Sequence, residues 1–439
     1  MKISLKNTAM SIMLLILFGY ASYSNIIARA TTGGAKYVLL AGLAVFAVMA
    51  NAKDMKLRIP SGGFPPYMVC WFLMALFVVS GITRVMFGSL QILVCIFFVL
   101  MCGSYEDWTD YSYNIAKFML GIFIFFTFFF FVFPALYRVV INFYGFIPDG
   151  TMRGQYPYRA GISSHYSINA INISLFFIIT AIRHISKFGL KLKFEKGYRL
   201  NFLLCAVSFV ALVMTSKRGV LVWSMLAIAI AYIFMEKGKI GNIFKIVMVA
   251  LVLLGVLSML AENVEFVNNL FERFKVVGSD EDNSSEQRFV MWQLALSAFA
   301  ENPVFGIGFW KYRELYNANL SAIYDKTGLH TSIDAHNVYI QVLCETGIVG
   351  FVIYISAIIF LLYRTISLLK KTDMANYRYK YILSLSLALQ LFYIFYSFSG
   401  NCFYDMTFFY YSFGMALTYS VENKYKLNSL QYNRQGAVQ

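Results

Sequence analysis

Charged side chains are scarce in this sequence of 439 residues, of which 13% are Asp, Glu, Lys or Arg and 59% are hydrophobic. A soluble domain usually carries about 25% charged residues. A soluble chain this apolar would have to expose a large apolar surface to water. The shortage of charge therefore excludes a cytosolic globular enzyme, a disordered protein and a nucleic-acid-binding protein. It leaves an all-α polytopic membrane protein.

Acidic residues are the rarer of the two charge types, with 22 Asp and Glu against 37 Lys and Arg, which gives a net charge of +15. In a soluble protein such an excess would suggest a nucleic-acid partner. In a membrane protein it orients the loops instead, because basic residues stay on the cytoplasmic side. We therefore expect no nucleic-acid partner.

Cysteine and histidine are also few, at six and four residues, and no Cys-x-x-Cys or Cys/His spacing is typical of a metal site. We therefore expect neither a bound metal nor a cofactor. Cys344 and Cys402 lie nearer the outer side than the other cysteines, and can form a disulfide only if the fold brings them together. The sequence thus predicts no disulfide framework.

Long apolar runs are what the sequence does contain, and a membrane-spanning helix needs about 20 such residues. Twelve runs qualify, and an even number places both termini on one side of the membrane. The predicted spans are 9–28, 35–52, 66–86, 88–104, 114–137, 164–182, 200–216, 219–235, 243–261, 338–363, 380–399 and 406–421.

The distribution of basic residues predicts the orientation of these spans. With both termini in the cytoplasm, 23 of the 37 Lys and Arg residues lie inside, in agreement with the positive-inside rule. The outer segment 262–337 then holds 11 of the 22 acidic residues. The chain is thus expected to divide into helices one to nine (1–261), a large extracytoplasmic loop with an interfacial helix (262–337), and the last three helices with a cytoplasmic tail (338–439).

The large outer loop contains a predicted helix that opens at Ser284, with Gln287 completing a capping box, and that ends at Pro303. Its two-sided pattern predicts a helix lying in the membrane interface. Arg288 falls in the first turn, where a guanidinium beside a helix N-terminus suits a phosphate group. Two other interpretations of Arg288 stay open, a salt bridge with Glu286 and a contact with lipid headgroups.

Two conspicuous segments follow that helix. Residues 302–308 (NPVFGIG) predict a loop packed under the helix rather than a nucleotide-binding loop. His336 stands where the outer loop re-enters the membrane, and there it is a general base, an acceptor-binding group or simply the cap of the next span. Glu345 lies about two turns into that span, which predicts a polar cavity or a bonded partner.

Six side chains converge on the outer face in this topology: Arg159, His165, Arg218, Arg288, His336 and Asp405. Each alone can be a simple headgroup contact. Together they suit a lipid diphosphate donor, with Arg side chains on the diphosphate and a His or Asp assisting a sugar hydroxyl. A transporter or flippase is the alternative, but it would predict inverted repeats and charges near the membrane midplane, and the sequence lacks both.

Residues 150–410 resemble the O-antigen ligase and polymerase (Wzy/WaaL-like) superfamily. The matching motifs are GISSHYSINA, TSKRG, EQRFVMWQLALSAFAENPVFGIGF and AHNVYIQVLCETGIVGF, with an acid in the last outer turn. The resemblance implies a metal-independent, inverting glycosyltransferase of GT-C-like fold that uses an undecaprenyl-diphosphate-linked glycan. It also implies that Arg218 and Arg288 bind the diphosphate, that His336 is catalytic, and that Asp405 is the family's acid, with Arg159 and His165 in support.

The resemblance leaves polymerase and ligase open, because both share these motifs. GISSHYSINA and NPVFGIG look more like capsule or exopolysaccharide polymerases, which favours polymerisation of lipid-linked repeat units over transfer to lipid A-core. The implied setting is the bacterial cytoplasmic (inner) membrane, with the reaction on its outer face. The implied partners are the glycan donor, a glycan acceptor (a lipid-linked repeat unit or lipid A-core), a chain-length regulator and a flippase.

Overall fold

The computed structural model describes residues 5–30, 64–80, 86–103, 108–151, 154–186, 196–235, 283–321, 334–372, 376–405 and 407–436, together with isolated residues 42, 268 and 323. All the regular elements in these ranges are helices, and no strand occurs among them. The predicted all-α class is therefore confirmed.

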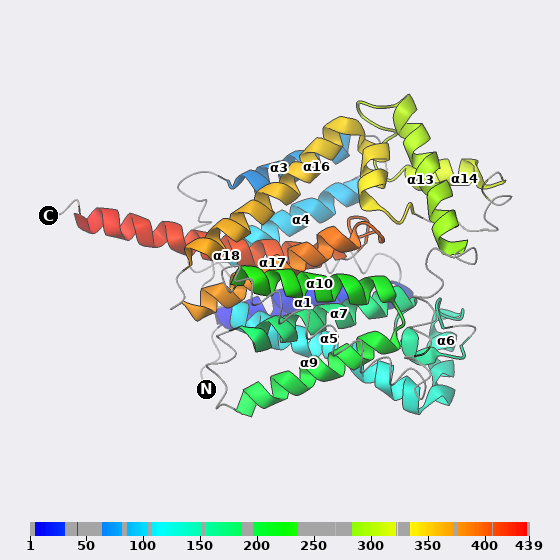
Figure 1. Cartoon of the computed structure of the whole chain (residues 1–439), viewed down its shortest axis with the longest axis horizontal. Coiled ribbons are helices and arrows are strands. Elements are labelled where there is room, and N and C mark those ends of the chain that lie inside the picture. The colour runs from blue at the N-terminus through cyan, green and yellow to red at the C-terminus, as the bar shows by residue number, and fades with distance from the viewer. Residues whose placement is uncertain are drawn as a thin grey trace.

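Most of the helices form one bundle, and the remaining elements are gathered at one of its ends (Figure 1). The bundle helices are α1 (Leu5–Ala30), α3 (Pro66–Ser80), α4 (Met86–Gly103), α5 (Trp108–Val132), α7 (Tyr166–Ile185), α9 (Lys196–Met214), α10 (Arg218–Met235), α16 (Val338–Lys371), α17 (Tyr377–Tyr396) and α18 (Thr407–Gly436). The remaining elements are η1 (Pro134–Tyr137), α6 (Arg138–Tyr144), η2 (Pro157–Arg159), α13 (Asn283–Glu301) and α14 (Tyr312–Ala318). In Figure 1, the last residues of α18 and the group of α6, α13 and α14 lie at opposite ends of the bundle.

Four helices of the described part are long and apolar enough to cross a membrane: Ser112–Val132, Tyr166–Ile185, Arg218–Met235 and Val338–Lys371. Four shorter apolar helices coincide with other predicted spans: Leu14–Ser24, Pro66–Val78, Gln91–Leu100 and Arg199–Met214. The predicted spans 35–52 and 243–261 lie outside the described residues apart from residue 42. The count of twelve spans and the GT-C-like arrangement therefore stay predictions.

Helix α17 is buried along nearly its whole length, although it is more polar than its neighbours α7, α10 and α16. Its polar residues bond to neighbouring helices: the Ser386 hydroxyl lies 2.8 Å from that of Thr418, and Gln390 Nε2 donates to Thr365 Oγ1 at 2.7 Å. Interhelical hydrogen bonds of this kind join helices where the hydrophobic effect supplies no driving force. They explain how a helix of modest hydropathy occupies the centre of a membrane bundle.

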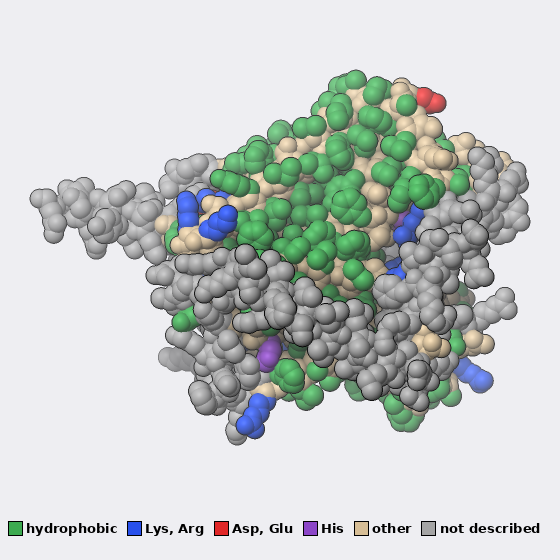
Figure 2. All heavy atoms as spheres, viewed as in Figure 1, with side chains coloured by type: hydrophobic (Ala, Val, Ile, Leu, Met, Phe, Trp, Pro, Cys, Tyr) green, Lys and Arg blue, Asp and Glu red, His purple; other side chains and the backbone are tan. Residues whose placement is uncertain are grey.

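The outside of the bundle carries large apolar side chains that a soluble protein would bury. Phe118 and Phe125 on α5 are 66% and 60% exposed, and Leu76 on α3 is 51% exposed. Figure 2 shows hydrophobic side chains over most of the described surface in this view, with Lys and Arg gathered towards the two ends. This distribution matches a helical bundle surrounded by lipid.

Candidate active site

Asn337, not His336, caps the helix that follows the outer loop. The Asn337 side chain accepts hydrogen bonds from the backbone N–H groups of Tyr339 and Ile340, at 3.1 and 3.2 Å. This is ordinary N-cap geometry. His336 precedes the cap with a φ of 53°, in the left-handed region that few residues other than glycine adopt. The interpretation of His336 as a helix cap is therefore wrong, and its imidazole is available for another role.

Three different elements hold the backbone on both sides of His336. The Ala335 carbonyl accepts from Trp292 Nε1 at 2.9 Å, and the Ala335 N–H donates to Gln341 Oε1 at 3.1 Å. On the other side, the Val338 N–H donates to the carbonyl of Ser397, at the end of α17, at 2.9 Å. Contacts from α13, α16 and α17 thus fix the unusual backbone conformation that presents the imidazole.

Helix α13 is the element that brings Arg288 towards this histidine. The helix begins at Asn283. Ser284 therefore lies inside the helix, and the prediction that Ser284 is its N-cap is wrong. Arg288 lies one turn before Trp292, and residues four apart share a helix face. Because Trp292 is bonded to Ala335, the same face points Arg288 to His336. The Glu286 side chain, the alternative partner of Arg288, lies outside the described residues.

The other faces of α13 agree with a helix between protein and membrane interface. Met291 and Ala295 are buried against Tyr312 and other residues of the outer segment, whereas Phe289 is 60% exposed. Leu296 is likewise 44% exposed, so this side of the helix presents apolar side chains at the surface. Its placement in the membrane interface stays a prediction.

Burial, together with nearby positive charges, keeps His336 neutral. Burial, followed by the nearby charges of Arg288 and Lys217, lowers its pKa from 6.5 to about 4, although Asp334 acts in the opposite direction. His165 contributes in the same sense as the two cations but more weakly. At neutral pH the imidazole can therefore accept a proton, as a general base must.

Lys217 is a further candidate site residue, because its charge acts on His336. Its Nζ lies 3.4 Å from the Tyr166 hydroxyl and 4.7 Å from the centre of that ring. Its signal in the sequence is the basic pair of Lys217 and Arg218 on the predicted outer side, of which only Arg218 is among the predicted site residues. Arg218 is half-buried and begins α10, and that end of α10 packs on the turn after α17 through the hydrogen bond from Trp223 Nε1 to Ser399 Oγ, at 3.0 Å.

Asp334 links the histidine segment to the last outer turn. Arg313 binds both carboxylate oxygens of Asp334 at 2.7 Å, and Asn401 Nδ2 donates to the same carboxylate at 3.1 Å. Asp405 lies in the same turn as Asn401, and its Oδ1 accepts from the Thr407 N–H at 2.7 Å. Burial raises the pKa of Asp405 from 3.8 to about 6. Asp405 is therefore connected to the His336 segment through Asn401 and Asp334.

His165 and Arg159 both make contacts with α7. His165 caps α7, because its Nδ1 accepts from the Ser167 N–H at 3.0 Å. Arg159 is buried, its guanidinium lies 4.5 Å above the Tyr156 ring, and its carbonyl accepts from Asn169 of α7. These contacts tie Arg159 to η2 and α7 rather than to the His336 segment.

Glu345 has the bonded partners that its position in a span predicted. Its carboxylate accepts from the backbone N–H groups of Trp310 and Tyr312 at 2.8 and 3.1 Å. The Tyr404 hydroxyl and Gln341 Nε2 also donate to it, at 2.7 and 3.2 Å. Since Gln341 also binds Ala335, Glu345 joins the outer loop, the last outer turn and the histidine segment.

Helix α16 is broken at Gly347, and the loop 302–308 fills the break. Gly347 has φ 61° and ψ −169°. The carbonyls of Cys344 and Glu345 accept from the N–H groups of Ile307 and Gly308, and the Ile348 N–H donates to the Pro303 carbonyl. The prediction that NPVFGIG packs as a structural loop is confirmed, and the predicted span 338–363 is two helical segments. Cys344 and Cys402, both buried, are free thiols.

Replacing Gly347 by Ala should destabilise the protein strongly. This φ/ψ region is essentially restricted to glycine and costs another residue about 1–3 kcal/mol. An added Cβ would also lie 2.3 Å from the Val304 carbonyl oxygen. The melting temperature of the detergent-solubilised protein measures the effect. Gly121→Ala is the matched control, because its Cβ would meet only the Phe176 side chain, at 3.7 Å. Equal melting temperatures for the two variants would contradict the assigned break.

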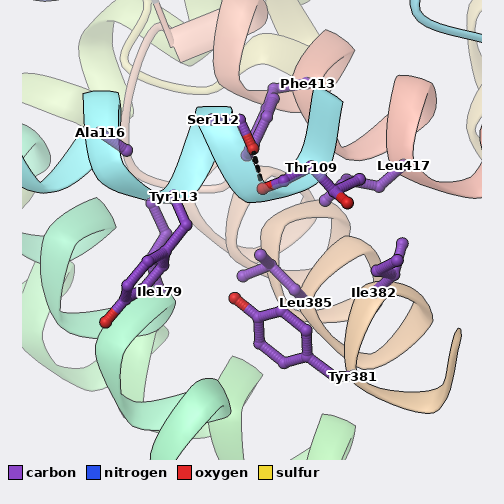
Figure 3. Close-up of a pocket in the computed structure, with 10 residues that line it drawn as sticks. All are labelled: Thr109, Ser112, Tyr113, Ala116, Ile179, Tyr381, Ile382, Leu385, Phe413 and Leu417. Atoms are coloured by element: carbon purple, nitrogen blue, oxygen red, sulfur yellow. Dashed lines mark hydrogen bonds between the residues drawn. The ribbon is translucent and has the colours of Figure 1, made fainter. Parts of the chain in front are cut away.

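A cavity near the beginning of α17 is too small to hold a substrate. Figure 3 shows side chains from α5, α7, α17 and α18 around it, among them Tyr113 and Tyr381. Its volume of about 10 Å³ is room for about one water molecule. Among the described residues, no three His, Cys, Asp or Glu side chains lie close enough together to hold a metal ion.

Residues 203–355 match the O-antigen ligase family (Wzy_C). The matched segment, about a third of the chain, runs from α9 to the middle of α16 and contains Arg218, Arg288 and His336. No curated protein matches the chain. The family match confirms the predicted resemblance to the O-antigen ligase and polymerase superfamily. With the apolar helices, the match supports an integral membrane enzyme of the O-antigen ligase and polymerase type.

Proposed function

We propose that this membrane enzyme of the O-antigen ligase and polymerase type is a polysaccharide polymerase. It joins oligosaccharide repeat units carried on undecaprenyl diphosphate, at the outer face of the bacterial cytoplasmic membrane. Both termini are then cytoplasmic. The gathering of α6, α13 and α14 at one end of the bundle supports this orientation (Figure 1).

The proposed reaction is a single displacement at the anomeric carbon of the donor glycan. The acceptor hydroxyl oxygen forms the new bond to this carbon as its proton passes to the neutral imidazole of His336. The bond from the anomeric carbon to the diphosphate oxygen breaks, and undecaprenyl diphosphate leaves with the electron pair. Arg218 and Arg288 hold that leaving group, with Lys217 nearby. One displacement inverts the configuration of the anomeric carbon.

The hydrogen bond between Trp292 and Ala335 is the observation that carries this proposal. It joins the helix of Arg288 to the residue before His336. This bond supports a cation for the leaving group beside a neutral base for the nucleophile. Such a pair is what a transfer from a lipid diphosphate requires, and neither group would be needed by a membrane scaffold.

A ligase is the second candidate function. The description of the matched family, O-antigen ligase, favours it. The GISSHYSINA and NPVFGIG segments favour the polymerase. A ligase would use the same arginines and histidine but would transfer a completed glycan to lipid A-core.

Deleting the gene and examining the surface glycan separates the two functions. Single repeat units on lipid A-core are expected if the chain is a polymerase, whereas full-length glycan left on the lipid carrier would identify a ligase. Complementation with the wild-type gene should restore normal chain length, and complementation with Arg288→Ala should not. An unchanged surface glycan in the deletion strain would contradict both functions.

A further inference from the structure

A cavity of about 210 Å³ lies beside Asp405, between α1, α7 and the beginning of α18. It is distinct from the grouping of Arg288, Lys217 and His336, and no step of the proposed displacement uses it. Its lining residues are Ala21, Ser22, Ser24, Ile168, Ile171, Asn172, Tyr404, Asp405, Thr407 and Tyr410.

The cavity lies close to the end of the bundle that carries the candidate active site. Ile168, Ile171 and Asn172 share one face of α7, and Asn172 is about 9 Å along the helix from its first residue at a rise of 1.5 Å per residue. From α18, Thr407 contributes from the first turn. The turn that contains Asn401 also supplies Tyr404 and Asp405 to the lining, and Asn401 is bonded to Asp334. A ligand in the cavity would therefore lie next to the segment that carries His336.

The lining has the chemistry of a carbohydrate site. The Tyr410 hydroxyl donates to Asn172 Oδ1 at 2.8 Å and is also hydrogen-bonded to Ser22 Oγ. The Asp405 carboxyl, which also lines the cavity, is a strong acceptor for hydroxyl groups. Tyr and Ile side chains supply apolar surface for the C–H face of a ring. Such a mixture suits a neutral ligand with many hydroxyl groups.

Charge and size narrow the choice of ligand. None of the described lining residues is Lys or Arg, and Asp405 would repel a diphosphate, so the leaving group does not belong here. A hydrocarbon chain would leave the serine, asparagine and aspartate groups without polar partners. Pockets for drug-sized ligands measure about 300–1,000 Å³, so a cavity of about 210 Å³ accommodates one sugar ring rather than several.

We propose that this cavity is a subsite for one neutral sugar residue of the glycan substrates, with Asp405 and Asn172 binding its hydroxyl groups. The inference rests on the proposed function and deepens it. It assigns Asp405 to substrate recognition, where the resemblance gave this acid no specific role. The sugar belongs to the donor or to the acceptor, and the experiment below separates these two sources.

The test fills the cavity without removing the hydrogen-bonded group formed by Tyr410, Asn172 and Ser22. Ser24→Leu adds apolar volume from α1, and Ser24→Ala, which removes the hydroxyl but adds no volume, is its control. Ile168→Phe fills the cavity from α7, so the test survives if Ser24→Leu does not fold. The melting temperature of each purified variant reports its folding.

Binding is measured first, by saturation-transfer NMR on the full-length protein in detergent. The probes are the methyl glycosides of glucose, galactose, mannose, rhamnose and N-acetylglucosamine at millimolar concentration. The wild-type protein and Ser24→Ala should saturate at least one glycoside, and a folded filling variant should lose that signal. Absence of a signal with every glycoside, or an equal signal from a folded filling variant, overturns the inference.

Transfer kinetics then identify the source of the sugar. A filling variant should raise a KM by about tenfold, which corresponds to about 1.4 kcal/mol of binding. An increase for a diphosphate-free oligosaccharide acceptor places the acceptor ring in the cavity, and an increase for the lipid-diphosphate donor places the donor ring there. Unchanged KM values for both substrates overturn the subsite. The proposed function fails separately, because it predicts loss of transfer in Arg288→Ala with glycoside binding retained.

Discussion

Replacing His336 by Ala should reduce glycan transfer by a factor of about 10²–10⁴, the usual contribution of a positioned general base. The acceptor hydroxyl then has no neutral imidazole to take its proton. The protein should still fold, because Asn337 caps α16 and the bonds around His336 are made by its neighbours' backbone groups. The measurement is the transfer rate of purified enzyme in proteoliposomes, together with the amount of protein in the membrane.

The pH dependence of the wild-type enzyme should carry the signature of this histidine. Its pKa is lowered to about 4 in the free protein, so the neutral form dominates above that pH and is lost as the pH falls through it. The acid limb of kcat/KM, which reports the free enzyme, should therefore lie well below pH 6.5. A bound diphosphate would offset the charges of Arg288 and Lys217 and raise the pKa of His336. The acid limb of kcat should consequently lie at higher pH than that of kcat/KM.

His184 provides the matched control for the His336 substitution. It lies in the last turn of α7, where its ring packs on Phe202, and not at the start of that helix where His165 is placed. His184→Gln should keep most of the transfer rate. A fully active His336→Ala variant, or an acid limb of kcat/KM near pH 6.5, would remove His336 from the mechanism.

Hydropathy predicted the helices because burial in a bilayer demands long apolar runs whatever the packing. It could not predict the break at Gly347, since a glycine in an apolar run has the same hydropathy in a helix and in a left-handed turn. The Glu345–Gly347 spacing was the available signal. An acid inside a span needs donors, and the loop 302–308 and its neighbours supply them only because the helix opens there.

The candidate site was predictable in its residue types but not in its arrangement. His336 and Asn337 are adjacent, and either can cap a helix, so only the hydrogen bonds to Tyr339 and Ile340 distinguish the cap from its neighbour. Lys217 and Arg218 are likewise adjacent and carry the same charge. Which of them acts on His336 depends on how α10 begins relative to Tyr166, and that relation is set by tertiary packing.

Replacing Arg288 by Ala should reduce transfer by a factor of about 10²–10³, the usual cost of removing one preorganised group that stabilises developing charge. The negative charge on the leaving diphosphate grows as the anomeric bond breaks, so the loss should fall mainly on kcat. Arg288→Lys should also fail, because an ammonium group cannot form the planar, two-bond contact of a guanidinium with phosphate oxygens. Arg138→Ala is the control, because Arg138 is an exposed arginine that begins α6 at the same end of the bundle.

The Lys variant also separates the two effects that Arg288 has on the site. It keeps the positive charge that lowers the pKa of His336, so the acid limb of its residual kcat/KM should stay where it is in the wild type. Arg288→Ala removes that charge, and its acid limb should move towards pH 6.5. A Lys variant with nearly full activity would mean that Arg288 acts by charge alone. Equal acid limbs in the Ala and Lys variants would mean that Arg288 does not lie beside His336, and the geometry on which the proposed transfer depends would then be wrong.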